Sequence, residues 1–248
     1  MHVVERSGVQ RAVLLIHGYC QSSAYWTPTL GRLADAGAYA MAPDLPGFGA
    51  SAKLPGPYTM EGYADALAHL LDERGLEQVV LVGGSLGGVV AQHFALRHPG
   101  RLLRLLLAAT GAVTADPAAA LAKADALAAA PWNEATVTPI VAGFFHRAMP
   151  AAELARYRAI ALMASQPAAV AAARSNAGSR TLDRLAEITL PTLIIQGRHD
   201  RARTPEHGAE MRDRISGARL EVLDGSGHTP HLEEPDAFHA LALPFLLA

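Results

Sequence analysis

The chain has 248 residues, of which 50% are hydrophobic and 18% are charged, and its formal net charge is −2. This length is sufficient to bury a core as one domain with an insertion. The charge gives no electrostatic reason to expect nucleic acid or an anionic membrane as a partner. The one cysteine, Cys20, excludes an intramolecular disulfide, and we interpret it as a packing residue.

Short apolar runs alternate with stretches of helical periodicity along most of the chain. The expected strands are residues 3–5, 11–16, 38–42, 78–82, 103–108, 192–196 and 220–223. The expected helices are residues 25–36, 60–74, 88–95 and 238–247. Such alternation is typical of an α/β protein with a mostly parallel sheet.

Residues 115–179 interrupt this alternation with an alanine-rich segment that has helical spacing and no convincing strand. Large apolar residues recur in it, which argues against low-complexity disorder. The sequence therefore predicts a core domain formed by residues 1–114 and 180–248 and a helical insertion formed by residues 115–179. We expect Trp132, Phe144, Phe145 and Tyr157 of the insertion to line a substrate pocket.

The motif Gly-Gly-Ser-Leu-Gly at residues 83–87 lies directly between an expected strand and an expected helix. A serine in this G-x-S-x-G context sits on a sharp turn that exposes its hydroxyl. Ser85 is therefore the candidate nucleophile. As a bare match the motif is also compatible with a plain turn.

Two partners for Ser85 follow in the chain, each after an expected strand. Asp200 follows the strand at 192–196, and His228 follows the strand at 220–223. Carboxyl ends of parallel strands share one edge of a sheet, so the three residues can meet there. His228 would take the serine proton, and Asp200 would orient the imidazole. Taken singly, the three residues could be a turn hydroxyl, a helix cap and a loop residue; the ordered set favours catalysis.

Acyl transfer also needs N–H donors where negative charge develops on the substrate oxygen. The strand at 13–16 ends in His17-Gly18, and the following loop is expected to supply the backbone N–H of Tyr19. The backbone N–H of Leu86, directly after the nucleophile, is expected to be the second donor. We interpret His17 as structural, with its ring holding this loop.

Other candidates compete for these roles. Asp116 is a second possible triad acid, although its place next to Pro117 favours a helix N-cap. His231 is a second possible base, and His199 a possible contact at the rim of the site. Asp44 is expected to brace a loop. No metal-ligand spacing and no glycine-rich phosphate loop with a lysine is found, so we expect neither metal nor cofactor.

These motifs together resemble the α/β-hydrolase superfamily. Within it, residues 200–205 and the compact insertion resemble the enol-lactonase and small-carboxylesterase branch, and residues 58–65 are similar to lactone-cleaving members. The matching segments are residues 17–19, 43–51, 83–88, 197–200 and 227–228. The resemblance implies an eight-stranded, mostly parallel sheet with helices on both faces, covered by a helical cap at residues 115–179. The N-terminus is short, so one of the first two antiparallel strands of that sheet is a candidate to be absent. Gly84 stands where relatives often carry a bulkier side chain, which would leave the pocket floor more open.

A serine nucleophile argues for acyl chemistry rather than epoxide or halide displacement. The sequence therefore predicts a hydrolase of small carboxylic esters or lactones that works through an acyl-enzyme. The alternatives are a carbon–carbon hydrolase, an acyltransferase or a cofactor-free perhydrolase with the same triad, or a ligand receptor on this fold. With no signal segment and no membrane-spanning run, a cytoplasmic location is expected. The oligomeric state is left open.

Overall fold

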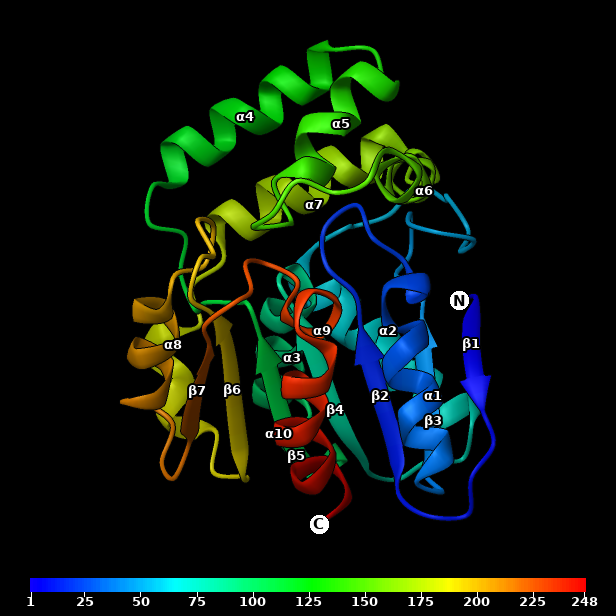
Figure 1. The fold of residues 1–248 in the computed structure, drawn as a ribbon, viewed down its shortest axis with the longest axis vertical. Helices are drawn as coiled ribbons and strands as arrows, with labels where there is room; N and C mark the ends of the chain where they lie inside the picture. The colour runs from blue at the N-terminus through cyan, green and yellow to red at the C-terminus, as the bar shows by residue number, and fades with distance from the viewer.

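The computed structural model describes residues 1–248 and contains one seven-stranded sheet with the strand order β1-β3-β2-β4-β5-β6-β7 (Figure 1). All neighbouring strands are parallel except β1, which runs antiparallel to β3. The strands are β1 Val3–Arg6, β2 Ala12–Ile16, β3 Tyr39–Pro43, β4 Val79–Gly84, β5 Leu102–Ala108, β6 Thr192–Gly197 and β7 Arg219–Leu223. The sheet thus keeps a single antiparallel strand at its N-terminal edge, one strand fewer than the resemblance implied.

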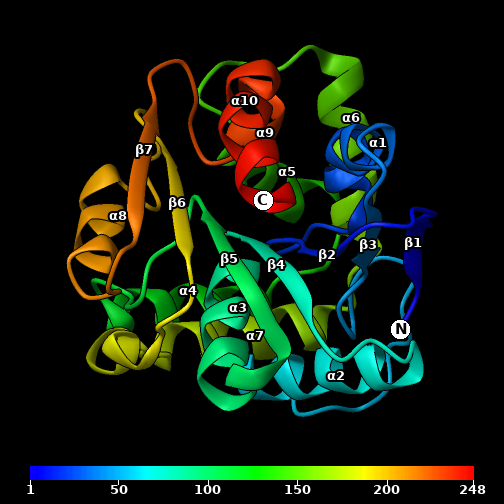
Figure 2. The ribbon, with the colours of Figure 1, turned by 90° about the horizontal axis from the view of Figure 1, so that it is seen from below.

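The central strands are buried on both faces because helices cover each side of the sheet, as Figure 2 shows from below. Successive residues of a strand point to opposite faces. In β2, Val13 and Leu15 pack toward α1 and α10, whereas Leu14 and Ile16 belong to the larger core under α2 and α3. Burial on both faces explains why these strands read as continuous apolar runs rather than alternating ones.

The helices of the core frame the sheet, with α1 and α10 on one face and α2, α3 and α8 on the other (Figure 2). The core helices are α1 Thr27–Asp35, α2 Met60–Glu73, α3 Leu86–Arg97, α8 Pro205–Arg212, α9 Pro230–Glu233 and α10 Pro235–Leu247, and short 3₁₀ turns occur at Ser23–Trp26, Pro99–Arg101 and Leu182–Glu187. None of the helices combines the length and apolar character that crossing a membrane requires.

The expected helix at 25–36 is divided in the structure. A 3₁₀ turn at Ser23–Trp26, capped by the side chain of Ser22, precedes α1. Pro28 lies in the first turn of α1 and has no N–H. A continuous helix would lose its i to i−4 hydrogen bond there, so the boundary falls where proline is tolerated.

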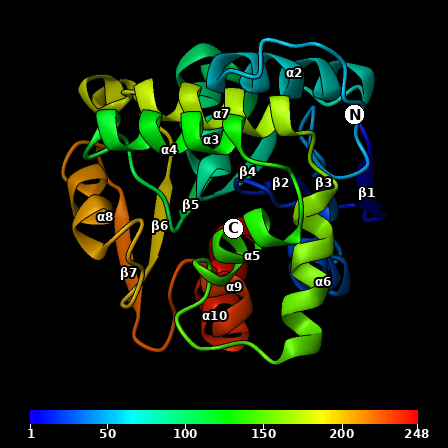
Figure 3. The same ribbon diagram turned by 90° about the horizontal axis from the view of Figure 1, so that it is seen from above.

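Between β5 and β6 the chain forms four helices that lie over the carboxyl ends of the strands (Figures 1 and 3). These cap helices are α4 Pro117–Ala129, α5 Glu134–Ala142, α6 Ala151–Leu162 and α7 Gln166–Gly178. Helix α4 packs along α7, and α5 packs along α6. A single antiparallel bridge between Val113 and Arg180 joins the outgoing and returning chain at the base of the cap helices.

Candidate active site

Ser85 occupies the turn between β4 and α3 in a strained backbone conformation. Its φ of 53° and ψ of −119° lie in a region that side-chain-bearing residues rarely adopt. Neighbouring strands hold this turn, since the Ser85 N–H donates to the carbonyl of Ala108 at 2.9 Å. The Thr110 hydroxyl donates to the Ser85 carbonyl at 2.7 Å. Strain that surrounding structure maintains in this way is typical of functional sites.

The glycines of the motif are required by close packing around this turn. A Cβ at Gly83 would lie 2.4 Å from the carbonyl oxygen of Gly87. A Cβ at Gly87 would lie 2.4 Å from the carbonyl oxygen of Ile16 in β2. Helix α3 can therefore begin directly against β2 and β4 only because both positions lack a side chain.

The structure brings the three predicted residues together at the carboxyl ends of β4, β6 and β7. His228 Nδ1 lies 2.7 Å from Asp200 Oδ2, and His228 Nε2 lies 2.6 Å from Ser85 Oγ. Because a carboxylate only accepts, Nδ1 donates to Asp200 and Nε2 is left to accept the serine proton. The other oxygen of Asp200, Oδ1, accepts the N–H groups of Ala202 and Arg203 at 2.8 and 2.9 Å. Asp200 and His228 are both buried.

The competing acid and bases lie elsewhere in the structure. Asp116 is the N-cap of α4, where its Oδ1 accepts the N–H of Ala119 at 2.9 Å. His231 is buried and stacks on Trp26, with ring centroids 4.1 Å apart, and burial lowers its pKa to about 3. His199 is exposed and stacks on His146 of the cap segment. None of them hydrogen bonds to Ser85.

Two backbone N–H groups beside Ser85 have no acceptor within the protein. Leu86 is the first residue of α3, where an N–H has no intrahelical partner. The N–H of Tyr19 likewise donates to no protein group. The loop that carries Tyr19 is held by its neighbours, because the Gly18 N–H donates to Gln21 Oε1 at 2.8 Å. These are the two donors that the sequence predicted for an oxyanion.

His17 and Asp44 are structural, as expected. The ring of His17 accepts the N–H of Leu45 at 2.9 Å through Nε2 and donates to the Gly18 carbonyl at 2.8 Å through Nδ1. Burial lowers the pKa of His17 and so favours the neutral ring, in which one nitrogen accepts a hydrogen bond and the other donates one. Asp44 accepts the N–H groups of Ser23 and Ala50, each at 2.7 Å.

Cys20 and Gly84 also bear on predictions made above. Cys20 is a buried core residue, and burial raises the pKa of its thiol to about 12. The pocket floor is not opened by Gly84. The ring of Trp26 fills that side, and a Cβ at Gly84 would lie 3.1 Å from it. The expectation of a more open floor is therefore wrong.

A cavity of about 590 Å³ contains Ser85 and His228 and extends beneath the cap helices. Of the four aromatic residues predicted to line it, only Phe144 does so. Trp132, Phe145 and Tyr157 do not, and the prediction for these three is corrected. The apolar lining comes instead from Leu127, Ile140 and small residues of α4 and α7.

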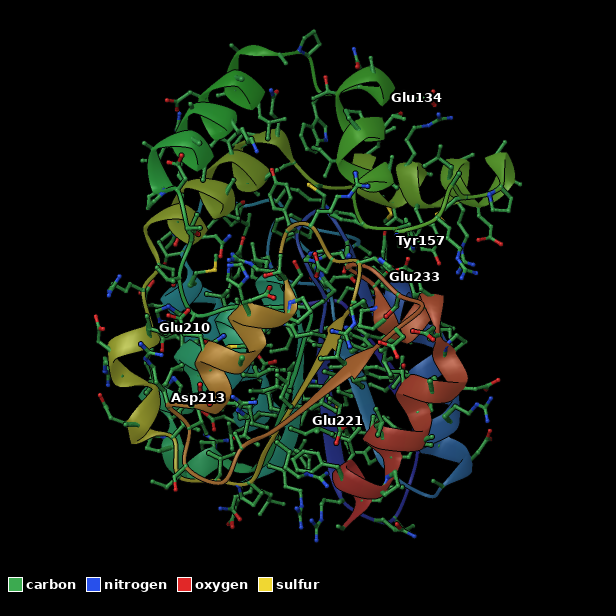
Figure 4. The ribbon with its side chains drawn as sticks, turned by 60° about the vertical axis from the view of Figure 1, so that its left-hand side comes forward. Glu134, Tyr157, Glu210, Asp213, Glu221 and Glu233 are labelled. Atoms are coloured by element: carbon green, nitrogen blue, oxygen red, sulfur yellow. The ribbon has the colours of Figure 1, made fainter.

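The three aromatic residues that do not line the cavity pack within the cap helices or against the core. The Tyr157 ring lies 4.7 Å from the ring of Tyr25 and 5.2 Å from that of Phe145. Figure 4 shows Tyr157 next to Glu233, with which it lines a separate cavity of about 200 Å³. Trp132 is partly buried against the larger core. Helical spacing marked these residues as apolar, but which face of the cap they occupy depends on how the four helices pack.

Glu233, at the end of α9, is a residue that the sequence analysis did not identify. Its Oε2 accepts the N–H groups of Gly227 and Thr229, at 3.0 and 3.1 Å, on either side of His228. The Thr229 hydroxyl also donates to Oε2 at 3.0 Å. Its Oε1 accepts the N–H of His146 in the cap segment at 2.6 Å. The sequence shows a carboxylate five residues after His228. Only the folded structure shows that α9 turns the chain so that this carboxylate contacts the loop around His228.

Comparisons with known proteins show what the whole chain is similar to. The sequence pattern of the alpha/beta hydrolase family matches residues 13–241. The chain is 30% identical over 255 residues to a 2-hydroxy-6-oxo-6-phenylhexa-2,4-dienoate hydrolase of Comamonas testosteroni, with 97% of this chain and 89% of that protein covered. It is 32% identical over 253 residues to a pimeloyl-(acyl-carrier protein) methyl ester esterase of Neisseria meningitidis, with 95% and 77% covered. A crystal structure of a hydrolase from Pseudomonas aeruginosa PA01 superposes with a TM-score of 0.92 at 28% identity, covering 99% of this chain and 94% of that one.

Proposed function

Since the chain belongs to the alpha/beta hydrolase family, we propose that it hydrolyses small carboxylic esters or lactones through a Ser85–His228–Asp200 triad. The observation that carries the proposal is the continuous chain of hydrogen bonds from Asp200 through His228 to Ser85, at 2.7 and 2.6 Å, with Ser85 and His228 lining one cavity. Serine at the turn makes an acyl-enzyme the natural intermediate.

In the first half of the proposed reaction, Ser85 Oγ attacks the substrate carbonyl carbon while His228 Nε2 takes the hydroxyl proton. The N–H groups of Tyr19 and Leu86 stabilise the oxyanion of the tetrahedral intermediate. When the bond to the alkoxy oxygen breaks, His228 returns the proton to that oxygen. The products of this half are an alcohol, or the hydroxyl end of an opened lactone, and the acyl group on Ser85.

In the second half a water molecule attacks the acyl-enzyme and His228 takes one of its protons. A second tetrahedral intermediate forms on the same two N–H groups. It collapses with return of the proton to Ser85 Oγ and release of the carboxylic acid. Asp200 keeps its position throughout, because Oδ1 is held by two backbone N–H groups while Oδ2 stabilises the imidazolium.

We further propose that residues 115–179 act as a cap that selects the substrate over a core of residues 1–114 and 180–248. The support is the cavity, whose walls come from both parts: Ser85 and His228 from the core, and Ile140 and Phe144 from the cap segment. The pocket would be mostly apolar with a few polar groups that orient the substrate, as small-molecule sites usually are.

The second candidate is hydrolysis of an activated carbon–carbon bond by the same triad. It is favoured by the similarity to the dienoate hydrolase of Comamonas testosteroni, which equals in extent the similarity to the esterase. A panel that contains p-nitrophenyl butyrate, a five-membered lactone and a 2-hydroxy-6-oxohexa-2,4-dienoate distinguishes the two candidates by kcat/KM.

The proposal is tested by Ser85→Ala, with Ser226→Ala as the matched control. Ser226 is a buried serine close to His228, and its hydroxyl has no hydrogen-bond partner. We expect Ser85→Ala to lower kcat by about 10⁴- to 10⁶-fold and to abolish labelling by a fluorophosphonate. Ser226→Ala should retain both. A purified Ser85→Ala protein with more than about a tenth of the original activity would contradict the assignment, since loss of a triad nucleophile costs far more than tenfold.

A further inference from the structure

One wall of the cavity that contains Ser85 carries basic side chains. Lys123 of α4, Arg201, Arg203 and His207 all line it. No carboxylate lies within salt-bridge distance of any of the four, whereas many other arginines of the chain have such a partner. The basic groups of this wall therefore form no salt bridge within the protein.

Arg203 is the half-buried arginine of the group, and one end of its guanidinium is anchored. Its Nη1 donates to the carbonyl of Val113 at 2.9 Å. Gly111 lies next to both basic groups, because a Cβ there would be in van der Waals contact with Nη1 at 3.4 Å and would lie 3.2 Å from the His207 ring. The guanidinium thus has a defined position between the chain after β5 and the start of α8.

The other edge of this guanidinium is open. Neither Nε nor Nη2 of Arg203 has a hydrogen-bond partner in the protein, and neither is sealed from solvent. The same Nε/Nη2 edge of Arg97 holds both oxygens of Asp65, at 2.9 and 2.6 Å. In Arg184 it holds both oxygens of Glu187, at 2.8 and 2.7 Å. Arg203 lines the cavity, and its unpaired edge is the one that in Arg97 and Arg184 receives a carboxylate.

Two acids beside this wall, Asp200 and Asp116, are already engaged in hydrogen bonds within the protein. Asp200 binds His228 and two backbone N–H groups, and Asp116 caps α4. Burial lowers the pKa of Arg203, opposed by the charge of Asp200, but a guanidinium stays protonated in proteins. A guanidinium that lines a cavity without a carboxylate partner leaves its Nε/Nη2 edge available to a ligand that carries a negative charge.

We infer that the Nε/Nη2 edge of Arg203 binds a carboxylate carried by the substrate, so that the enzyme prefers anionic esters or lactones to neutral ones. The planar fork of a guanidinium matches the two oxygens of a carboxylate, which a lysine ammonium does not. His207 supports the same group, since Nδ1 contacts the Thr204 hydroxyl at 3.2 Å and leaves Nε2 without a protein partner. The inference rests on the proposed function and names its substrate class.

The test compares matched pairs of esters on the wild-type chain and on Arg203→Met. One pair carries the charge on the acyl side: mono-p-nitrophenyl glutarate against p-nitrophenyl pentanoate. The other carries it on the leaving group: 4-carboxyphenyl acetate against phenyl acetate. In the pair that matches the natural orientation, we expect Arg203→Met to lower the anionic-to-neutral ratio of kcat/KM by about 10- to 100-fold, the value of a charge-assisted bidentate pair. Hydrolysis of the neutral esters serves as the folding control.

Two further variants sharpen the result. Arg203→Lys keeps the positive charge but lacks the paired N–H donors of a guanidinium. It should therefore retain only part of the preference for anionic over neutral esters. Arg212→Met removes a surface arginine that pairs with Asp213 outside the cavity, and should change the ratio by less than about twofold. If the ratio is unchanged by Arg203→Met in both pairs, the inference is overturned while the proposed function stands. If no ester is hydrolysed and Ser85 is not labelled by a fluorophosphonate, the proposed function itself fails.

Discussion

The sheet and the cap helices differ in how deeply their residues are buried. Every residue of β2, β4 and β6 is buried, and these strands place the backbone around Ser85 and Asp200. In α4, by contrast, Ala124 is the one buried residue of the helix. Close-packed interiors hold atoms to within fractions of an ångström, whereas lightly packed helices shift at small cost. In the proposed reaction, chemistry that depends on hydrogen-bond geometry therefore comes from the strand ends, and the surfaces that meet the rest of the substrate come from the cap helices.

The two regions meet at a few polar contacts as well as at apolar ones. Glu233 binds the backbone on both sides of His228 and the N–H of His146 in the cap segment. The Thr229 hydroxyl lies between Glu233 Oε2, at 3.0 Å, and the carbonyl oxygen of Phe144 in the cap segment, at 3.1 Å, and shares its one hydrogen between these two acceptors. The loop of the histidine is therefore the place where a change in the cap can reach the triad, and the predictions below probe both regions and this junction.

The largest effect is expected in the core, from loss of the carboxylate that orients His228. Asp200→Asn should lower kcat by roughly 10²- to 10⁴-fold, because the imidazole loses its orienting acceptor. Asp116→Asn is the matched control, since Asp116 lines the same cavity but caps α4. It should change kcat/KM by less than about threefold, as expected for an exposed residue away from the chemistry. Steady-state kinetics on both variants decide the point, and the reverse ranking would refute the assignment of Asp200.

An intermediate effect is expected at the junction. Glu233→Ala leaves the N–H groups of Gly227 and Thr229 without their acceptor, so the loop should hold His228 less well. We expect kcat to fall by about 10- to 100-fold with a smaller change in KM, the signature of lost positioning. Glu233→Gln keeps an acceptor oxygen and should recover much of the rate.

Glu234 provides the control for this prediction. Its Oε2 accepts a single N–H, that of Gly225, at 2.8 Å, farther from His228. Glu234→Ala should therefore cost less than Glu233→Ala in kcat. Equal losses in the two variants, or a change confined to KM, would show that Glu233 does not position the histidine.

A smaller effect is expected from the cap wall. Phe144→Ala and Ile140→Ala enlarge the cavity and should shift KM and acyl-length preference by about 3- to 10-fold while the chemical step survives, because such contacts act on ground and transition state alike. Trp132→Ala, outside the cavity, should leave the length profile unchanged. The measurement is kcat and KM for p-nitrophenyl esters of increasing acyl length. A profile altered by Trp132→Ala alone would place substrate selection elsewhere in the cap.

The smallest effect on activity, and a distinct one on stability, is expected from His231. Its pKa is lowered to about 3 in the folded chain, against an ordinary value of 6.5. The unfolded chain therefore binds the proton more readily below pH 6.5, so stability is complete above that pH and is lost as the pH falls toward 3. His231→Phe keeps the stack on Trp26 and should reduce the loss of unfolding free energy between pH 7 and pH 5 by about 2 kcal/mol.

Urea unfolding at the two pH values measures this difference. His69→Phe, a substitution of an exposed histidine on α2, is the control and should leave the pH dependence as it is. If His231→Phe has the same pH dependence as the original chain, burial of a neutral His231 does not contribute to acid sensitivity.

The sequence alone determined the strands, their order along the chain and the identity of the triad candidates. Apolar runs predicted the strands to within one or two residues, and Ser85, Asp200 and His228 followed because each stands directly after such a run. Local patterns suffice there, since parallel strands have to bring their carboxyl ends to one edge. The N-cap role of Asp116 was also readable, because capping is a property of neighbouring residues.

Only the tertiary structure decided the pocket walls, the surroundings of Gly84 and the roles of two charged residues, because these depend on contacts between distant segments. The pocket walls were misassigned for Trp132, Phe145 and Tyr157 because helical spacing shows that a residue is apolar but not which neighbour covers it. Gly84 suggested open space that Trp26, remote in sequence, fills. Glu233 and Arg203 were overlooked because a charged side chain reveals its role only through its surroundings. Glu233 accepts backbone N–H groups on both sides of His228, and Arg203 lines the cavity with one edge of its guanidinium unpaired.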